Sequence, residues 1–260
     1  MATKRKSKRR VCLLDELRGF AIVLMVFYHA FYLVGYTFDV EFCRALFRFF
    51  YPVQPFFAAL FVFLCGISCN FSRSNVKRGL LLAGVAILLS AVMWCAVFWR
   101  MLTPDNYIWF GVLHLLAVSI LLFALLRPTL KYIPPWLGLV LCAVLFVLCY
   151  HVPADMGGYF GLRGLFTLSI PTAATDHPLL YAFGLCPVTL CGDYFPLLPW
   201  VFCFFAGTFV GRWKTPKWAY RSRFPWLAVV GKQSLWVYLL HQPVLYLLCE
   251  AILWLAKAIG

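Results

Sequence analysis

The amino-acid sequence predicts an all-α integral membrane protein, a polytopic bundle of about seven transmembrane helices. Of the 260 residues, 64% are hydrophobic and only 12% are charged, whereas a soluble globular protein is about half apolar and about a quarter charged. The apolar residues also stand in long blocks separated by basic loops, a pattern typical of multi-pass membrane proteins. Together these observations exclude a disordered chain and a soluble core. We expect a basic tail at residues 1–11 and a single membrane domain over residues 12–260.

Seven blocks of the sequence are apolar enough to span a membrane, for which a helix needs roughly 20 residues. In chain order they cover residues 17–38, 52–72, 79–99, 107–127, 135–151, 196–213 and 234–256, and the fifth and sixth are short. Prolines mark several boundaries between blocks; they stand at Pro52–Pro55, Pro104, Pro134–Pro135, Pro196–Pro199 and Pro216. The first block is not followed by a small-residue cleavage site, so we expect it to be retained as a span.

The distribution of basic residues predicts the orientation. With the N-terminus inside, only five of the 23 Lys and Arg residues are external, which leaves 18 on cytoplasmic segments. The positive-inside rule then predicts a cytoplasmic N-terminus and an external C-terminus. The first ten residues, MATKRKSKRR, fit a topogenic signal, and binding of phosphate or anionic lipid is the alternative. A net charge of +14 would also be compatible with a nucleic-acid-binding protein. Such a protein carries its basic residues on a water-exposed face, whereas here they gather at the ends of apolar blocks, so no nucleic-acid partner is expected.

Residues 152–195 form the longest segment between spans and are predicted to be external. They contain GGYFGLRG at 157–164 and an apolar stretch at 177–192. The glycine spacing does not match a phosphate-binding loop, and a loop of this length is often functional. We therefore expect a re-entrant or interfacial loop that caps a cavity. Cys186 and Cys191 share this loop and would pair only in oxidising surroundings. Most other cysteines lie in spans, and without a CxxC pair we expect no metal.

The first span carries three ionisable residues on one face. Asp15 and Arg18 stand one helical turn apart and can pair. His29 follows Arg18 by eleven positions, so it returns to within about 20° of the same face, roughly 16 Å further along the axis. Titratable groups inside spans are costly and usually face a cavity or the bundle interior. The stripe therefore predicts a functional site, and a boundary salt bridge beside one structural histidine is the alternative.

Two further histidines lie inside spans. His114 stands in the fourth span, and His241 stands in the seventh with Tyr238 on the same helical face. Each is either a structural residue or a catalytic one, and spacing alone does not decide between them.

The second span ends in a group of small and polar residues that includes Ser68, and Arg73 and Arg78 follow it. Together with Arg18, the two arginines would form a basic entrance on the cytoplasmic side that suits phosphate or pyrophosphate groups. Anchoring by the positive-inside rule alone is the alternative.

Five sequence blocks resemble one known family. They are LDELRGFAIVLMVFYHAFY (14–32), FLCGIS (63–68), IWFGVLH (108–114), DYFPLLPW (193–200) and GKQSLWVYLLHQP (231–243). In this order they resemble the heparan-alpha-glucosaminide N-acetyltransferase catalytic-domain family of transmembrane acyltransferases, in its short bacterial form. The resemblance spans nearly the whole chain.

The resemblance implies a multi-pass enzyme of the cell membrane, among membrane lipids. It would take an acyl group, typically acetyl from cytosolic acetyl-CoA, and pass it to an extracytoplasmic sugar amine or hydroxyl. The family's essential histidine falls on His29, and its aspartate and arginine at the start of that helix fall on Asp15 and Arg18. Its later motif residues are His114, His241 and Asp193. The resemblance leaves open the acceptor, the acyl chain length and whether the transfer is to nitrogen or oxygen. It also leaves open whether the protein works as a single chain or as a homodimer.

Acyl transfer from a thioester needs a base or a transient nucleophile, and histidine serves as either near neutral pH. We therefore predict a catalytic group of His29, Asp15 and Arg18, in which His29 is the base or transient acyl carrier and the other two set the inner entrance. Coenzyme binding is assigned to Arg18, Arg73, Arg78 and Ser68, and auxiliary or substrate contacts to His114, His241, Asp193 and Tyr238. Two other classes use the same residues: a small transporter or flippase with a histidine proton relay, and a structural partner in a membrane assembly.

Overall fold

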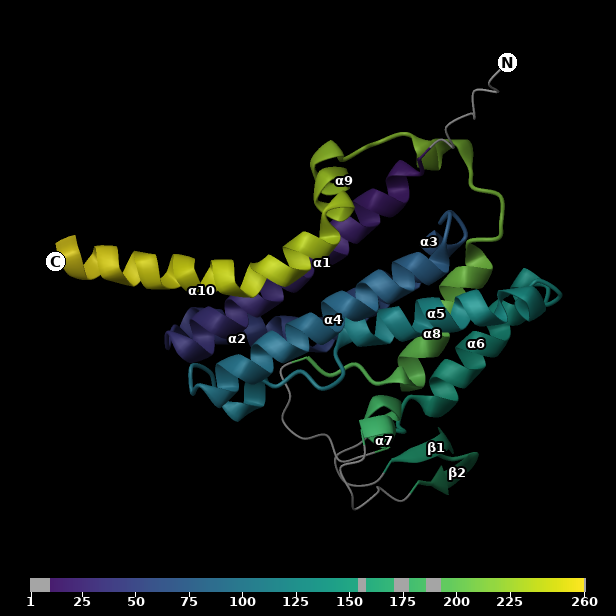
Figure 1. Cartoon of the computed structure of the whole chain (residues 1–260), viewed down its shortest axis with the longest axis horizontal. Coiled ribbons are helices and arrows are strands. Elements are labelled where there is room, and N and C mark those ends of the chain that lie inside the picture. Colours follow the sequence, from purple (N-terminus) through teal and green to yellow (C-terminus); the bar gives the residue numbers. More distant parts are fainter. Residues whose placement is uncertain (1–9, 154–157, 171–177, 186–192, 260) are drawn as a thin grey trace. The chain divides into compact units, whose positions relative to one another are not determined.

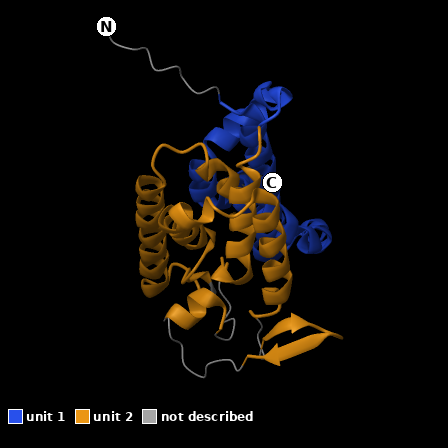
Figure 2. Ribbon diagram, turned by 90° about the vertical axis from the view of Figure 1, so that its right-hand side faces the viewer, with its two compact units in different colours: residues 1–64, 215–260 blue, residues 65–214 orange. Residues whose placement is uncertain are grey.

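The computed structural model describes residues 10–153, 158–170, 178–185 and 193–259. The chain forms two compact units, coloured in Figure 2: unit 1 comprises Met1–Leu64 and Thr215–Gly260, and unit 2 comprises Cys65–Lys214. Helices make up nearly all of the regular structure described in each unit (Figure 1), which confirms the predicted helical membrane class. Most of the basic tail and the proposed Cys186–Cys191 pair lie outside the described residues.

Unit 1 is built around its first helix, which packs against α2, α9 and α10. Its elements in chain order are α1 (Cys12–Tyr32), the π-helical turn η1 (Leu33–Thr37), α2 (Glu41–Phe50), the 3₁₀ turn η2 (Tyr51–Val53), α3 (Gln54–Cys69), the 3₁₀ turn η4 (Lys217–Tyr220), α9 (Pro225–Lys232) and α10 (Ser234–Ile259). The last residues of α3 belong to unit 2. Proline at the first position of α9 suits a helix start, where its missing N–H is not needed.

Helices α1 and α9 meet backbone to backbone because each has a glycine at the crossing. A Cβ atom on Gly19 would collide with the carbonyl oxygen of Leu227, and one on Gly231 would collide with the carbonyl oxygen of Asp15. Small residues permit this close approach of two helices. Only one residue separates α9 from α10, so the crossing also fixes where α10 begins beside α1.

The main helix contacts of unit 2 form two pairs, α4 with α5 and α6 with α8. Its elements are α4 (Asn75–Phe98), the 3₁₀ turn η3 (Pro104–Asn106), α5 (Val112–Leu130), α6 (Pro135–Cys149), β1 (Tyr159–Leu162), β2 (Phe166–Ser169), α7 (Pro178–Phe183) and α8 (Leu197–Val210). Ser74 caps α4 by accepting a hydrogen bond from the backbone N–H of Lys77. Ile120 and Phe204 are fully buried in the core of this unit.

The long segment after α6 contains a small β-hairpin that was not predicted. Strand β1 pairs antiparallel with β2, and Gly164 in the connecting turn has a positive φ of 93°, which glycine adopts without strain. The N–H of Tyr159 donates to the carbonyl of His151 over 3.1 Å and ties the hairpin to the end of α6. The re-entrant or interfacial character of this segment stays a prediction, and parts of it lie outside the described residues.

All seven predicted blocks coincide with apolar helices. Among the described residues, five helical stretches are long and apolar enough to cross a membrane, namely Cys12–Thr37, Glu41–Cys69, Asn75–Phe98, Val112–Leu130 and Ser234–Leu255. The fifth and sixth blocks correspond to α6 and α8, with 15 and 14 residues. At about 1.5 Å per residue these two reach only about 22 Å, against about 30 Å of hydrocarbon. The number of spans and the N-inside orientation therefore stay predictions.

Candidate functional site

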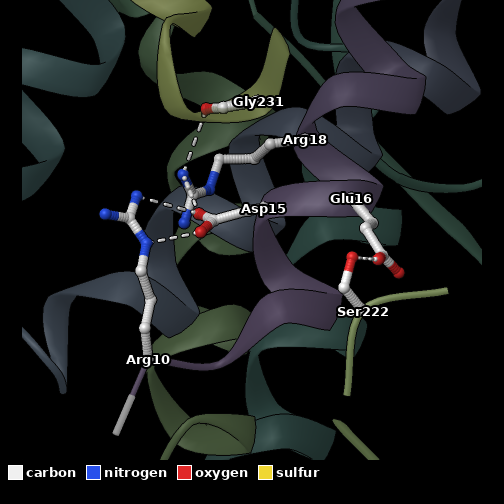
Figure 3. Close-up of polar contacts among 6 residues, drawn as sticks. All are labelled: Arg10, Asp15, Glu16, Arg18, Ser222 and Gly231. Carbon is white, nitrogen blue, oxygen red and sulfur yellow. Dashed lines mark hydrogen bonds and ion pairs between the residues drawn. The ribbon is translucent and has the colours of Figure 1, made fainter. Parts of the chain in front are cut away.

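The carboxylate of Asp15 is buried at the start of α1 and holds two guanidinium groups (Figure 3). Arg10 Nε lies 2.5 Å from Oδ2, and Arg18 Nη1 lies 3.0 Å from Oδ1. The hydrogen bond to Asp15 raises the pKa of Arg10. Arg18 Nη1 also donates to the carbonyl of Gly231 over 3.3 Å. The Asp15–Arg18 pair that the spacing predicted is present, and it ties α1 to α9.

Glu16, the next residue, is also buried and holds the entry to α9. Its Oε1 accepts three hydrogen bonds: from Ser222 Oγ at 2.6 Å, from the N–H of Arg223 at 2.7 Å and from the N–H of Phe224 at 3.0 Å. These donors immediately precede the helix, where backbone N–H groups lack helical partners. Glu16 therefore acts as a side-chain anchor between α1 and the segment that leads into α9.

His29 of α1 and His241 of α10 lie against each other within unit 1. Their ring centroids are 5.0 Å apart with an interplanar angle of 53°. Gln242 Nε2 lies 3.4 Å from Nδ1 of His29. His29 is half-buried and His241 is only 8% exposed. The fold thus joins the first-span histidine to a second imidazole that follows it by more than two hundred residues in the sequence.

The hydrogen bonding of His241 fixes the protonation of its neutral ring. Nδ1 lies 2.7 Å from the backbone carbonyl of Tyr238. Because a carbonyl can only accept, Nδ1 carries the proton and Nε2 carries the lone pair. Nε2 is buried and has no hydrogen-bond partner among the residues that the structure describes. A buried polar atom in this state needs an explanation, and a functional role is one.

His114 and Asp193 come together in unit 2, at the first turn of α5. The N–H of Val112 donates to Oδ2 of Asp193 over 3.2 Å, and the N–H of Gly111 donates to Nδ1 of His114 over 3.3 Å. Nε2 of His114 faces the hydroxyl of Ser90 at 3.5 Å. Both predicted residues therefore satisfy backbone groups at the start of a helix, which would otherwise lack partners.

The residues predicted to bind the coenzyme fall in both units. In unit 2, the guanidinium of Arg78 lies 3.1 Å from Sγ of Cys65, Arg73 is exposed, and Ser68 is half-buried near the end of α3. Arg18 belongs to unit 1. The basic entrance that would join the three arginines stays a prediction.

Within unit 1 the described residues serve two different purposes, one structural and one chemical. The Asp15 and Glu16 carboxylates hold α1 to the α9 region, whereas the His29–His241 pair can accept and pass a proton in apolar surroundings. Neither Glu16 nor Gln242 was predicted from the sequence. Each stands directly beside a predicted residue, Glu16 after Asp15 and Gln242 after His241, and that adjacency was the available signal.

Comparison with known proteins gives one match. The family model described as "Heparan-alpha-glucosaminide N-acetyltransferase, catalytic" matches residues 10–243. This range contains all five sequence blocks noted above, from LDELRGF to LLHQP, and it confirms the resemblance. Among curated proteins and among solved structures, none matches the chain.

Proposed function

Because the chain belongs to the heparan-alpha-glucosaminide N-acetyltransferase catalytic family, we propose that it moves an acetyl group from cytosolic acetyl-CoA to a sugar across the cell membrane. The family match and the five candidate spans indicate a membrane acetyltransferase in general. The proposal adds a donor on the cytoplasmic side, a sugar amine or hydroxyl on the other side, and His29 at the reaction centre.

The observation that carries the proposal is the His29–His241 pair. Two imidazoles stand 5.0 Å apart between centroids within the candidate spans Cys12–Thr37 and Ser234–Leu255, where titratable groups are costly without a function. Histidine is also the side chain best suited to exchange a proton near neutral pH. The pair therefore supports a proton-transfer centre beside the first helix.

In the proposed transfer, the acceptor nitrogen attacks the carbonyl carbon of the acetyl thioester. A C–N bond forms, the C–S bond breaks, and coenzyme A leaves as its thiol. His29 Nε2 takes the proton from the acceptor nitrogen and returns it to the departing sulfur. This requires a proton on Nδ1, which the amide oxygen of Gln242 accepts when the amide is turned toward the ring. If His29 carries the acetyl group briefly instead, the same lone pair is the nucleophile.

His241 acts through His29 and is a positioning residue. The proton on its Nδ1 is held by the Tyr238 carbonyl, so its Nε2 lone pair is fixed on the ring beside His29. In the proposal this lone pair stabilises the proton that His29 carries during transfer.

On the donor side, we assign Arg18, Arg73 and Arg78 to the phosphates of the coenzyme, with Ser68 as a further hydrogen-bonding group. Guanidinium groups bind phosphate through charge-assisted, often bidentate hydrogen bonds. Asp15 is then a positioning residue, because its carboxylate lies 3.0 Å from Nη1 of Arg18.

His114 and Asp193 keep the auxiliary role that the family resemblance implies. Their contacts hold the first turn of α5 in place. Replacement of either residue should therefore reduce stability as well as activity.

The proposal is tested by supplying the purified protein with acetyl-CoA and glucosamine and measuring N-acetylglucosamine by mass spectrometry. Thiol reagents that follow free coenzyme A are unsuitable, because the chain has eleven cysteines. The wild type should form product, and His29→Ala should lower the rate at least about a hundredfold. His151→Ala is the matched control, since its exposed ring stacks on Tyr159 in unit 2. Full activity in His29→Ala contradicts the catalytic assignment.

The imidazole pair also favours one alternative, a proton-coupled transporter or flippase. In liposomes such a protein would move a sugar or lipid across the membrane while acetyl-CoA stays intact. Substrate flux without thioester consumption would replace the acetyltransferase proposal with this one.

A further inference from the structure

Four tyrosines gather around one phenylalanine at the end of α1. Phe47 of α2 lies with its ring centroid 4.9 Å from Tyr28, 5.3 Å from Tyr32, 5.5 Å from Tyr36 and 5.9 Å from Tyr51. These five residues come from α1, η1, α2 and η2 of unit 1. We refer to them as the aromatic platform.

The platform continues directly from His29. Tyr28 contacts the His29 ring edge to face, with centroids 5.5 Å apart. Tyr32 follows His29 by three positions and so stands one turn beyond it on the same face of α1. The ring of Tyr36 in η1 lies 5.3 Å from that of Tyr32 between centroids. A ligand on the platform would therefore lie one to two helical turns beyond the proposed reaction centre.

A close backbone contact holds the two sides of the platform together. A Cβ atom on Gly35 in η1 would approach the backbone nitrogen of Arg44 in α2 to 2.8 Å. Glycine at this position therefore lets α2 pack across η1, which brings Phe47 between the tyrosines.

The platform is accessible, and each of its four tyrosines carries a hydroxyl group. Tyr32 and Tyr36 are each 50% exposed and Tyr51 is 64% exposed, so it is no closed core. The four tyrosine rings surround the single ring of Phe47, which gives an apolar surface with several phenolic donors and acceptors.

We propose that the aromatic platform binds the pyranose ring of the acceptor and presents its amine or hydroxyl to His29. This inference rests on the proposed function and deepens it by assigning the acceptor subsite. A pyranose has an apolar face of C–H groups and a rim of hydroxyls. The C–H face packs on the electron-rich faces of aromatic rings, and the rim pairs with tyrosine hydroxyls. The subsite therefore selects cyclic sugars over open-chain amines.

The kinetic test compares glucosamine with ethanolamine, a primary amine without a ring. Tyr32→Ala should raise the KM for glucosamine about tenfold while the KM for acetyl-CoA and the rate with ethanolamine stay unchanged. Tyr32→Phe keeps the ring and should show a smaller rise. Trp94→Ala is the matched control, because Trp94 is a similarly exposed ring stacked on Phe98 in unit 2. Equal losses with both acceptors overturn the assignment.

A binding experiment separates this inference from the proposed function. Saturation-transfer NMR with methyl β-D-glucosaminide, without acetyl-CoA, reports contact between sugar and protein. The wild type and Trp94→Ala should show transfer to the ring protons, and Tyr32→Ala should lose most of it while its thermal unfolding midpoint is kept. If the wild type binds the sugar in this way but does not consume acetyl-CoA, the platform stands and the proposed function fails. Absence of transfer in the wild type overturns the platform.

Discussion

The two ring nitrogens of His241 differ in their hydrogen bonding. Nδ1 donates to the carbonyl of Tyr238, whereas Nε2 is buried and unpartnered among the described residues. A buried acceptor left unsatisfied costs about 1–3 kcal/mol, so the residue is retained at a cost to stability. The proposed proton exchange with His29 accounts for that cost.

Replacing His241 should therefore separate stability from activity. His241→Phe fills a similar volume and removes the unsatisfied nitrogen, so its thermal midpoint should equal or exceed that of the wild type. Its kcat should fall about ten- to a hundredfold, which corresponds to about 1.4–2.8 kcal/mol of barrier, with little change in the KM for acetyl-CoA. His241→Gln, which keeps a polar atom, should recover part of the rate. A destabilised His241→Phe with unchanged kcat would show that the residue is structural.

For Glu16 we predict the opposite of His241: its replacement should lower stability without a direct effect on catalysis. Glu16→Ala leaves the N–H groups of Arg223 and Phe224 without their acceptor, and should lower the free energy of unfolding by about 1–3 kcal/mol. Any loss of activity should follow from unfolding and vanish at low temperature. Glu41→Ala is the control, because Glu41 forms exposed ion pairs with Arg44 and Arg48 that contribute little. Equal midpoints for Glu16→Ala and the wild type, measured by thermal unfolding, would remove the anchoring role.

At the scale of elements, the α1–α9 crossing depends on its glycines. Gly19→Ala places a methyl group against the Leu227 carbonyl, so the helices must separate and the thermal midpoint should fall clearly. Gly84→Ala in α4 is the matched control, since nothing lies within 4 Å of its added Cβ. That change should be neutral or stabilise by up to about 1 kcal/mol through helix propensity. If both variants unfold at the wild-type temperature, the crossing is not held by close packing.

The same elements show what periodicity can and cannot predict. The Asp15–Arg18–His29 face followed from 100° per residue, because α1 is one continuous helix from Cys12 to Tyr32. The amphipathic helix α2 was missed because its ten residues are too few to span a membrane. The four-residue strands β1 and β2 were missed because such short sequences give no sustained period. The contact between His29 and His241 joins α1 to α10. Such a contact between elements distant in the sequence cannot be predicted from the periodicity of either helix.

At the scale of the whole molecule, composition and motif order predicted more of the protein's class and family than helix geometry did. Long apolar blocks predicted the helical membrane class, and five blocks in order predicted the family that the match over residues 10–243 confirms. Orientation rests on the excess of basic residues on one side. We therefore expect the acetyl group to move in one direction across the membrane, from a donor on the side of the N-terminus to an acceptor on the other side.

The most direct test of the central claim is acetyl transfer across sealed vesicles that contain the purified protein. Acetyl-CoA, which does not cross the membrane, is added outside, and glucosamine is enclosed within. The account predicts N-acetylglucosamine in the vesicle interior with the wild type and with His151→Ala, and a rate at least about a hundredfold lower with His29→Ala. Equal accumulation of product with His29→Ala and the wild type would contradict it.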